Sequence, residues 1–220
     1  MLSKWLKRSA IVQVFCGSFA FAPAFSESVA VPPPPTPSVF DDTNPSKDFN
    51  IGVKLGRFPI KFETTTLTEV QKVAAAERID RQGDAGEAIL WLCYSVRQGP
   101  IGEAIWLISS AEMGGSAHSI TDVVLEKMDE NDPSAKCPQL PPNFSAITIG
   151  SGVRLGSSLK EILKTLGKPT RISSDWYVYT YQGKVPDTCQ PGGLDRIKWL
   201  IARFADGLLV EIHTGQTTSC

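Results

Sequence analysis

The stretch Leu155-Gly-Ser-Ser-Leu-Lys-Glu-Ile-Leu-Lys-Thr-Leu-Gly-Lys-Pro169 contains both ends of a short amphipathic helix. Ser158 and Glu161 form an S-x-x-E capping box, in which each side chain satisfies a backbone N–H of the first turn. Gly167 suits the left-handed residue that follows a helix, and Pro169 prevents its continuation. Between these ends, apolar residues recur at helical spacing: Leu159, Ile162, Leu163 and Leu166. An isolated helix of roughly ten residues is marginal in water, so we expect this stripe to pack on a sheet.

A weaker copy of the pattern occurs earlier in the chain, and the segments that follow the two copies also match. Thr66 and Glu69 repeat the capping box. The next matches are Trp91-Leu-Cys-Tyr94 with Trp176-Tyr-Val-Tyr179, Trp106-Leu-Ile108 with Trp199-Leu-Ile201, and Gly114 with Gly207. The order of these matches predicts an internal duplication.

The segments around the aromatic residues have the pattern of antiparallel strands. We predict strands at 88–96, 104–110, 175–182, 196–205 and 208–214. Asp206-Gly207 between two apolar runs is a strong hairpin signal, whereas 120–128 allows either a strand or a short helix. We therefore expect an α+β fold of two tandem repeats, each a short capped helix packed on an antiparallel sheet.

The first 26 residues have the features of a secretory signal peptide. Lys4, Lys7 and Arg8 precede an apolar run at 10–22, and small residues at 22–26 suit cleavage. An uncleaved anchor is the alternative, but the run is shorter than the roughly 20 residues that span a bilayer. Cys16 follows Phe15, where lipid attachment requires a small residue, so we expect no lipidation. The mature chain is expected to be periplasmic or secreted, with no transmembrane span.

The segment 27–49 is predicted to be a disordered, proline-rich tether. Val31-Pro-Pro-Pro-Pro-Thr-Pro37 favours an extended polyproline II conformation, which cannot pack a core. It is interpreted as a spacer, and a site for a proline-binding partner is the alternative. We place repeat one at 50–130, a linker at 131–146 and repeat two at 147–220.

The charge of the mature chain bears on its partners. Removing the three basic residues of 1–26 from the 22 of the whole chain leaves 19 against 23 acidic residues, a net charge of about −4. A mildly acidic chain with no basic stripe argues against nucleic acid as a partner.

Four cysteines remain after cleavage, namely Cys93, Cys137, Cys189 and Cys220. An even number in an exported chain favours two disulfides, for which three connectivities exist. We prefer Cys93–Cys137 and Cys189–Cys220, because each pair then lies within or beside one repeat. A zinc site is the alternative, but no C-x-x-C pair exists and neither histidine has ligand-like spacing to a cysteine.

The pattern of Leu155–Pro169 followed by Trp176-x-x-Tyr179 resembles the repeat unit of the β-lactamase inhibitor protein-like superfamily. That superfamily includes the small SmpA/OmlA lipoprotein of the outer-membrane barrel assembly machinery. The resemblance covers about 147–214 well and 60–128 weakly. Two copies with disulfides look more like the secreted inhibitor, and the missing lipidation cysteine departs from the lipoprotein. Such short motifs specify a fold better than a function.

Candidate partner-binding residues come from the aromatic strand at 175–182. Tyr177, Tyr179 and Tyr181 share one face of a strand, opposite Trp176. If the helix covers the Trp176 face, the tyrosines lie on the open face, where large rings with polar tips suit a protein-binding surface. The alternative is that these tyrosines line the core.

The loop from Gly183 to Gly193 is the second candidate. It separates the paired tryptophans by 23 residues instead of the 15 of the first copy. A loop fixed by Cys189 is ordered before binding, and Lys184 and Asp187 are its candidate polar contacts. The alternative is a disulfide-fixed hairpin with no binding role.

No motif of a known catalytic site is present. The sequence has no G-x-S-x-G, P-loop or dinucleotide fingerprint. Ser116 and His118 are near in sequence, but such spacing is more typical of a turn than of a nucleophile site. Glu112 and Asp206 are likewise interpreted as turn residues. We predict no catalytic residue, no metal and no cofactor.

Three hypotheses about function follow. The first is an exported, non-catalytic protein-binding module of the cell envelope, whose partner is an envelope protein or a secreted hydrolase. The second is an enzyme or small-ligand carrier with its site in a groove between the repeats, near His118 or His213. The third is a structural envelope component. The repeat, the aromatic residues and the missing catalytic motifs favour the first.

Overall fold

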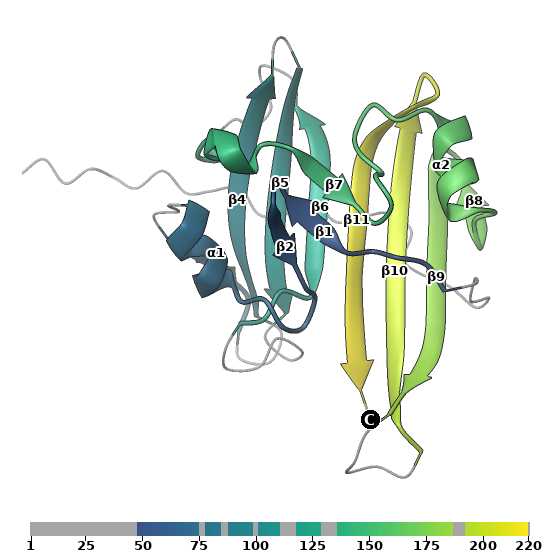
Figure 1. Cartoon of the computed structure of the whole chain (residues 1–220), viewed down its shortest axis with the longest axis horizontal. Coiled ribbons are helices and arrows are strands. Elements are labelled where there is room, and N and C mark those ends of the chain that lie inside the picture. Colours follow the sequence, from purple (N-terminus) through teal and green to yellow (C-terminus); the bar gives the residue numbers. More distant parts are fainter. Residues whose placement is uncertain are drawn as a thin grey trace, which may run out of the picture.

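An antiparallel sheet of eight strands forms the body of the protein (Figure 1). The computed structural model describes residues 48–74, 78–84, 88–98, 101–110, 118–128, 136–186 and 192–219. The predicted signal peptide and residues 27–47 of the tether lie outside these described residues. In order across the sheet, the strands are β3 (Asp80–Gln82), β4 (Ile89–Gln98), β5 (Ile101–Ser110), β6 (Asp122–Met128), β11 (Leu208–Ser219), β10 (Leu194–Ala205), β9 (Trp176–Val185) and β8 (Arg171–Ser173).

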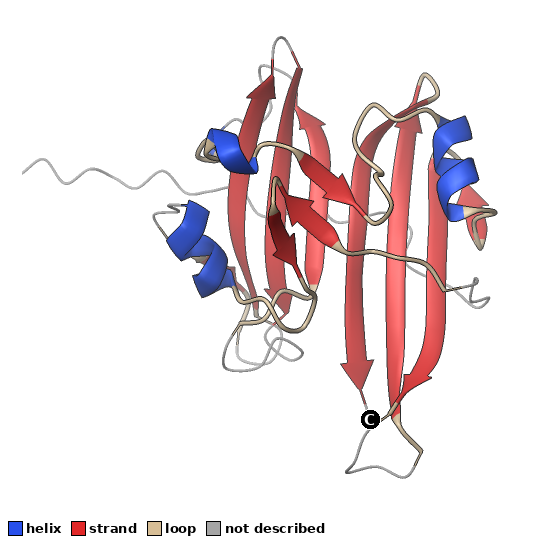
Figure 2. Ribbon diagram, in the orientation of Figure 1, coloured by secondary structure: helices blue, strands red, loops and turns tan. Residues whose placement is uncertain are grey.

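A smaller antiparallel sheet and two helices cover one face of the large sheet, which we call the covered face (Figure 2). The small sheet has the order β2 (Phe58–Ile60), β1 (Val53–Leu55) and β7 (Ile147–Ile149). The helices are α1 (Leu67–Ala74) and α2 (Leu159–Leu166), and a 3₁₀ turn at Pro142–Phe144 precedes β7. Apolar side chains from all of these elements form one core with the covered face.

Both helices begin at the capping boxes that the sequence predicts. Glu161 N–H donates to the Ser158 hydroxyl at 3.3 Å, and Ser158 N–H donates to the Glu161 carboxylate at 2.7 Å. Thr66 and Glu69 make the same pair of bonds, at 3.1 and 2.7 Å. The apolar stripe of α2 is only partly confirmed, because Leu163 keeps 38% of its surface exposed.

The strand predictions are also confirmed, with longer strands than expected. β10 and β11 pair along almost their whole length, and Ala205 faces Leu208 across the turn. Asp206 and Gly207 have φ angles of 50° and 73°, as a tight hairpin turn with two left-handed residues requires. The ambiguous segment at 120–128 contains strand β6, which pairs with β5 and β11.

The expected fold class, two tandem α+β repeats with a separate helix-on-sheet layer each, is wrong. Strand accounts for 55% and helix for 14% of the described structure, so the fold is mostly β. The two expected sheets are one sheet, because β6 pairs with β11 from Asp122↔Gly215 to Glu126↔Glu211. The small sheet also joins the two expected units, since β1 pairs with β7.

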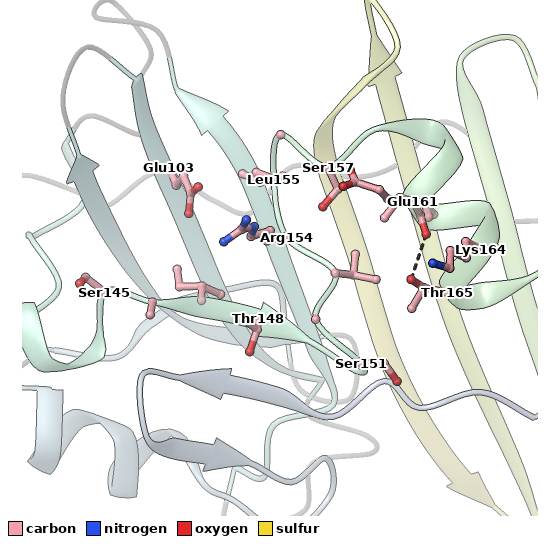
Figure 3. Close-up of a pocket in the computed structure, with 16 residues that line it drawn as sticks. Glu103, Ser145, Thr148, Ser151, Arg154, Leu155, Ser157, Glu161, Lys164 and Thr165 are labelled. Atoms are coloured by element: carbon pink, nitrogen blue, oxygen red, sulfur yellow. Dashed lines mark hydrogen bonds between the residues drawn. The ribbon is translucent and has the colours of Figure 1, made fainter.

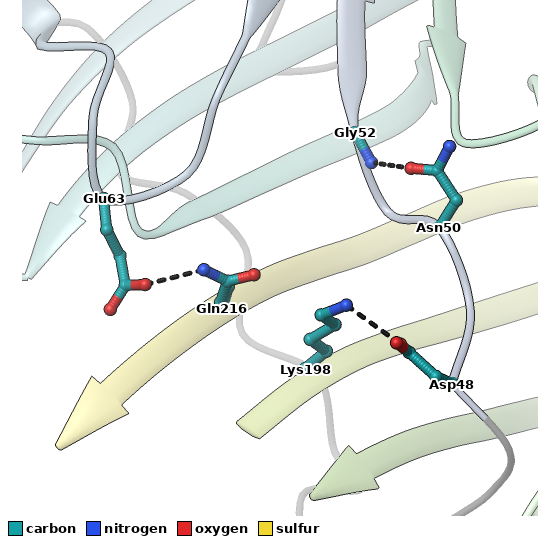
Figure 4. A network of polar contacts seen from close by, with 6 residues as sticks. All are labelled: Asp48, Asn50, Gly52, Glu63, Lys198 and Gln216. Atoms are coloured by element: carbon teal, nitrogen blue, oxygen red, sulfur yellow. Dashed lines mark hydrogen bonds and ion pairs between the residues drawn. The ribbon is translucent and has the colours of Figure 1, made fainter. Parts of the chain in front are cut away.

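The described N-terminal segment is bound to strands that lie far away in sequence (Figure 4). The Lys198 ammonium of β10 forms an ion pair with Asp48 at 2.9 Å. The Glu63 carboxylate accepts hydrogen bonds from the Gln216 amide at 2.6 Å and the Thr218 hydroxyl at 2.8 Å, both on β11. These contacts hold the segment that contains β1 and β2 against the large sheet.

The opposite face of the large sheet has two further apolar clusters. Trp91 and Trp106 pack with Val124 and with the Cys93–Cys137 disulfide. Val178, Trp199 and Ile201 form the other cluster, against which Trp176 packs.

Candidate functional site

A large concavity lies on the covered face, at the seam between the β3–β6 and β8–β11 halves of the large sheet. It has a volume of about 1130 Å³, and we call it the seam cleft (Figure 3). β5, β7, the loop 151–157 and α2 supply its walls. The residues that line it are Glu103, Ser145–Thr148, Ser151–Ser157, Glu161, Ile162, Lys164 and Thr165.

The loop 151–157 is held in place at both ends by backbone hydrogen bonds. Ile149 N–H donates to the Val153 carbonyl at 2.8 Å, which closes the turn after β7. Gly156 N–H donates to the Leu209 carbonyl, and Leu209 N–H donates to the Ser157 carbonyl, so the loop continues the sheet beside β11. Val153 is buried and Leu155 is partly buried, which leaves Arg154 exposed between them and directed into the cleft (Figure 3).

Four charged side chains line the seam cleft, two of each sign. Glu103 comes from β5, Arg154 from the loop, and Glu161 and Lys164 from α2. Burial raises the pKa of Glu103 above its ordinary value, and the Arg154 guanidinium partly opposes this. Hydrogen bonds from the Ser158 N–H and hydroxyl lower the pKa of Glu161, and Arg154 adds to this effect. The cleft therefore has one half-buried carboxylate facing one exposed guanidinium.

Glu103 and Arg154 are both available to a ligand. Within the described part of the chain, neither side chain forms a hydrogen bond or an ion pair with another residue. A smaller hollow of about 270 Å³ adjoins the cleft and shares Glu103, Leu155 and Gly156 with it. Val96, Lys127 and residues 208–210 complete this hollow, so the open volume follows the seam.

The three candidate tyrosines lie on the covered face, and only part of this set is accessible. Tyr179 is fully buried, its hydroxyl donates to the Gly167 carbonyl at 3.3 Å, and burial raises its pKa to about 12. Tyr177 packs edge-on against Phe204, with ring centroids 5.0 Å apart. Tyr181 is partly exposed and lies beneath the Lys198 ammonium. Since α2 and the N-terminal segment cover this face, Tyr177 and Tyr179 serve the core.

Of the two candidate contacts in the loop from Gly183 to Gly193, the structure describes only Lys184. Lys184 forms an exposed ion pair with Asp195 across the β9–β10 ladder, at 2.9 Å. Asp187 lies outside the described residues, as do Cys189 and Cys220. Cys93 and Cys137 form the first of the two predicted disulfides, with Cα atoms 5.4 Å apart.

Neither histidine lines the seam cleft. His213 is buried on the opposite face, where its Nε2 donates to Glu211 at 2.6 Å and its ring packs against Trp176. Arg203 donates to the same carboxylate at 2.7 Å. His118 is partly buried in the turn before β6, and Ser116 lies outside the described residues. The groove predicted near these histidines is therefore lined by other residues.

The sequence analysis did not identify Glu103 and Arg154. A signal for Glu103 was present, because it is the one charged residue in the otherwise apolar and uncharged run from Ile101 to Ser110. Arg154 has no such signal, since an arginine in a glycine-rich loop is common on any surface. Its position depends on how the loop crosses the seam.

The described residues contain no group of three or more histidine, cysteine, aspartate or glutamate side chains suited to a metal ion. Neither described helix has the length and apolar character that crossing a membrane requires. Models of known protein families, curated proteins and solved structures yield no match to this chain.

Proposed function

We propose that the protein is an exported, non-catalytic binding module of the cell envelope, and that it binds a protein partner at the seam cleft. The partner is an envelope protein or a secreted hydrolase. The observation that carries this proposal is the pair Glu103 and Arg154, two opposite charges that line the open cleft and form no hydrogen bond or ion pair within the described part of the chain.

The shape of the cleft favours a polypeptide over a small molecule. Small-ligand sites are mostly apolar cavities of roughly 300–1,000 Å³ that enclose most of the ligand. The seam cleft, at about 1130 Å³, lies near the upper end of this range, but it is open: Ser151, Arg154, Lys164 and Thr165 on its walls are exposed. A segment of a partner protein matches an open, polar-walled site of this size.

The backbone hydrogen bonds that fix the loop 151–157 to β7 and β11 also support binding. A wall that is fixed before a partner arrives lowers the entropic cost of association. The Cys93–Cys137 disulfide is consistent with an oxidising compartment, as export to the envelope requires. The resemblance of 155–169 to the β-lactamase inhibitor protein-like superfamily is consistent with a binding role.

Site-specific photocrosslinking in the native host tests the proposal. Lys164 and Lys160 are both exposed on α2, but only Lys164 lines the seam cleft. A crosslinker at position 164 is expected to capture one discrete protein, and a crosslinker at position 160 is not. Arg154→Gln, which removes the charge without reversing it, should abolish the capture, and the melting temperature of the variant checks that it is folded. Equal patterns from the two positions, or no capture from either, would reject the proposal.

A further inference from the structure

One edge of β7 is an unused strand edge inside the seam cleft. β1 pairs with the other edge, in the register Val53↔Ile149 and Leu55↔Ile147. In Figure 3, β1 runs along one side of β7, and Glu103 and Arg154 lie beyond the other side. Residues 145–148 of this segment line the cleft.

The hydrogen-bond pattern identifies which backbone groups point into the cleft. Gly56 N–H donates to the Ala146 carbonyl, and Gly150 N–H donates to the Gly52 carbonyl. In an antiparallel pair, successive residues direct their N–H and C=O groups to opposite edges. Residues 146, 148 and 150 therefore face β1, and Ile147 and Ile149 face the other way.

Only one of these two outward-facing residues is satisfied within the chain. Ile149 N–H donates to Val153, and the Ile149 carbonyl accepts from the N–H groups of Gly152 and Val153, at 3.1 and 2.9 Å. The described residues provide no such partner for the N–H and C=O of Ile147. One donor and one acceptor thus remain open at the centre of the edge, with the spacing that a paired strand offers.

We propose that the seam cleft binds an extended peptide segment of the partner as an additional strand on β7, with one peptide residue exchanging both backbone hydrogen bonds with Ile147. This inference rests on the proposed protein-binding function. Such strand addition obtains affinity from the main chain and selectivity from the side chains that alternate along the segment.

The alternation also defines the selectivity. Side chains of paired residues point to the same face, so the peptide residue opposite Ile147 points inward, as buried Ile147 does. There it meets Glu103 at the base of the cleft, with Arg154 beside it. A side-chain amide satisfies both groups, because it donates to the carboxylate and accepts from the guanidinium. Asparagine or glutamine is therefore the expected residue at this position.

Backbone N-methylation of bound peptides tests strand pairing directly. Linear peptides would be selected from a random displayed library on the immobilised full-length protein. Each selected peptide would then be N-methylated at one position at a time. Methylation of the residue opposite Ile147 should abolish binding, and methylation of either neighbour should be tolerated, because the N–H groups of the neighbours point away from β7. A flat or non-alternating profile, or a selection that yields no peptide, overturns the inference.

A second measurement tests the role of Glu103. Glu103→Gln keeps the side-chain shape and is expected to weaken peptides with an amide opposite Ile147 by about tenfold, the effect of one hydrogen bond to a charged group. Peptides with alanine at that position should bind both proteins equally, and equal weakening of both sets contradicts the assignment. If crosslinking from position 164 succeeds while the methylation profile stays flat, the protein-binding function stands and only strand pairing fails.

Discussion

Asp122 and Glu211 lie on the same face of the eight-stranded sheet, yet their environments shift their pKa values in opposite directions. Burial raises the pKa of Asp122 to about 6, and a hydrogen bond from the Thr121 hydroxyl only partly offsets it. Burial alone would raise the pKa of Glu211 too, but hydrogen bonds from His213 and Arg203 outweigh it and lower the pKa. The hydrogen-bond partners of each carboxylate, more than its burial, decide whether its charged form stabilises or destabilises the folded protein.

We predict that Asp122→Asn stabilises the protein at neutral pH. A carboxyl whose pKa is raised in the folded state destabilises that state as pH rises from its ordinary value near 4 to about 6. Asn keeps an acceptor for Thr121 and carries no charge. The expected gain is about 1–2 kcal/mol at pH 7, after allowing for the partial exposure of Asp122. Urea unfolding from pH 3 to pH 8 should show the gain vanish below pH 4, and a pH-independent difference contradicts this account.

Glu211→Gln should have the opposite effect. The amide oxygen of Gln can accept from only one of the two positions that Arg203 and His213 occupy, and it carries no charge to balance Arg203. The expected loss is about 3 kcal/mol of the free energy of unfolding at pH 7. A lowered pKa stabilises the folded state above the ordinary pKa of 4.5 and is lost as pH falls through the folded value. As the pH is lowered, the free energy of unfolding of the variant should therefore fall less steeply than that of the wild type, as urea unfolding at a series of pH values would measure. The exposed Asp195→Asn is the control, with an expected change below about 0.5 kcal/mol.

At the scale of elements, the small sheet depends on a glycine that packs against another backbone segment. Gly56 has a φ of 57°, and a Cβ there would clash with the Asn143 carbonyl of the 3₁₀ turn. This contact, with the Gly56–Ala146 hydrogen bond, holds β1 and β7 in register. Since β7 forms one wall of the seam cleft, the geometry of the cleft depends on this packing.

Gly56→Ala is expected to destabilise the protein by about 2–4 kcal/mol, because a strained φ and a backbone clash add. Gly207→Ala is the matched control: its φ of 73° is close to that of Gly56, but a Cβ there has no atom within 4 Å. The free energy of unfolding of that variant should fall by only about 1 kcal/mol. Chemical denaturation of both proteins measures the difference, and equal losses would mean that the Gly56 packing contributes nothing.

At the scale of the whole molecule, the Cys93–Cys137 disulfide attaches the segment that connects the two halves of the chain to strand β4 of the large sheet. Ser95 N–H donates to the Pro138 carbonyl, and Leu140 N–H donates to the Ser95 carbonyl. The Ser95 hydroxyl donates to the Cys137 carbonyl at 2.9 Å. The segment expected to be a linker is thus packed on β4 at its described end, with Leu140 buried in the core.

The free energy of unfolding of the double variant Cys93→Ser/Cys137→Ser should be lower by about 4 kcal/mol, since the disulfide closes a loop across 44 residues. This corresponds to a fall of roughly 10 °C in melting temperature for a chain of this size. Calorimetry under non-reducing conditions measures the fall. Substitution is preferable to a reducing agent because Cys189 and Cys220 remain unchanged. A melting temperature within 2 °C of the wild type would contradict a stabilising role.

Local sequence determined the elements well, because their signals involve neighbours in the chain. The capping boxes at Thr66 and Ser158 need residues only three positions apart, and Asp206-Gly207 specifies its own turn. The Cys93–Cys137 pair was also predictable from the few alternatives that four cysteines allow.

The assembly of these elements was decided by tertiary structure alone. The pairing of β6 with β11 and of β1 with β7 joins residues about ninety positions apart, and no short pattern encodes such a register. That pairing made one sheet out of the two expected ones. It also brought Glu103 and Arg154 together across the seam, where an isolated charge in a strand and an ordinary loop arginine become one candidate site.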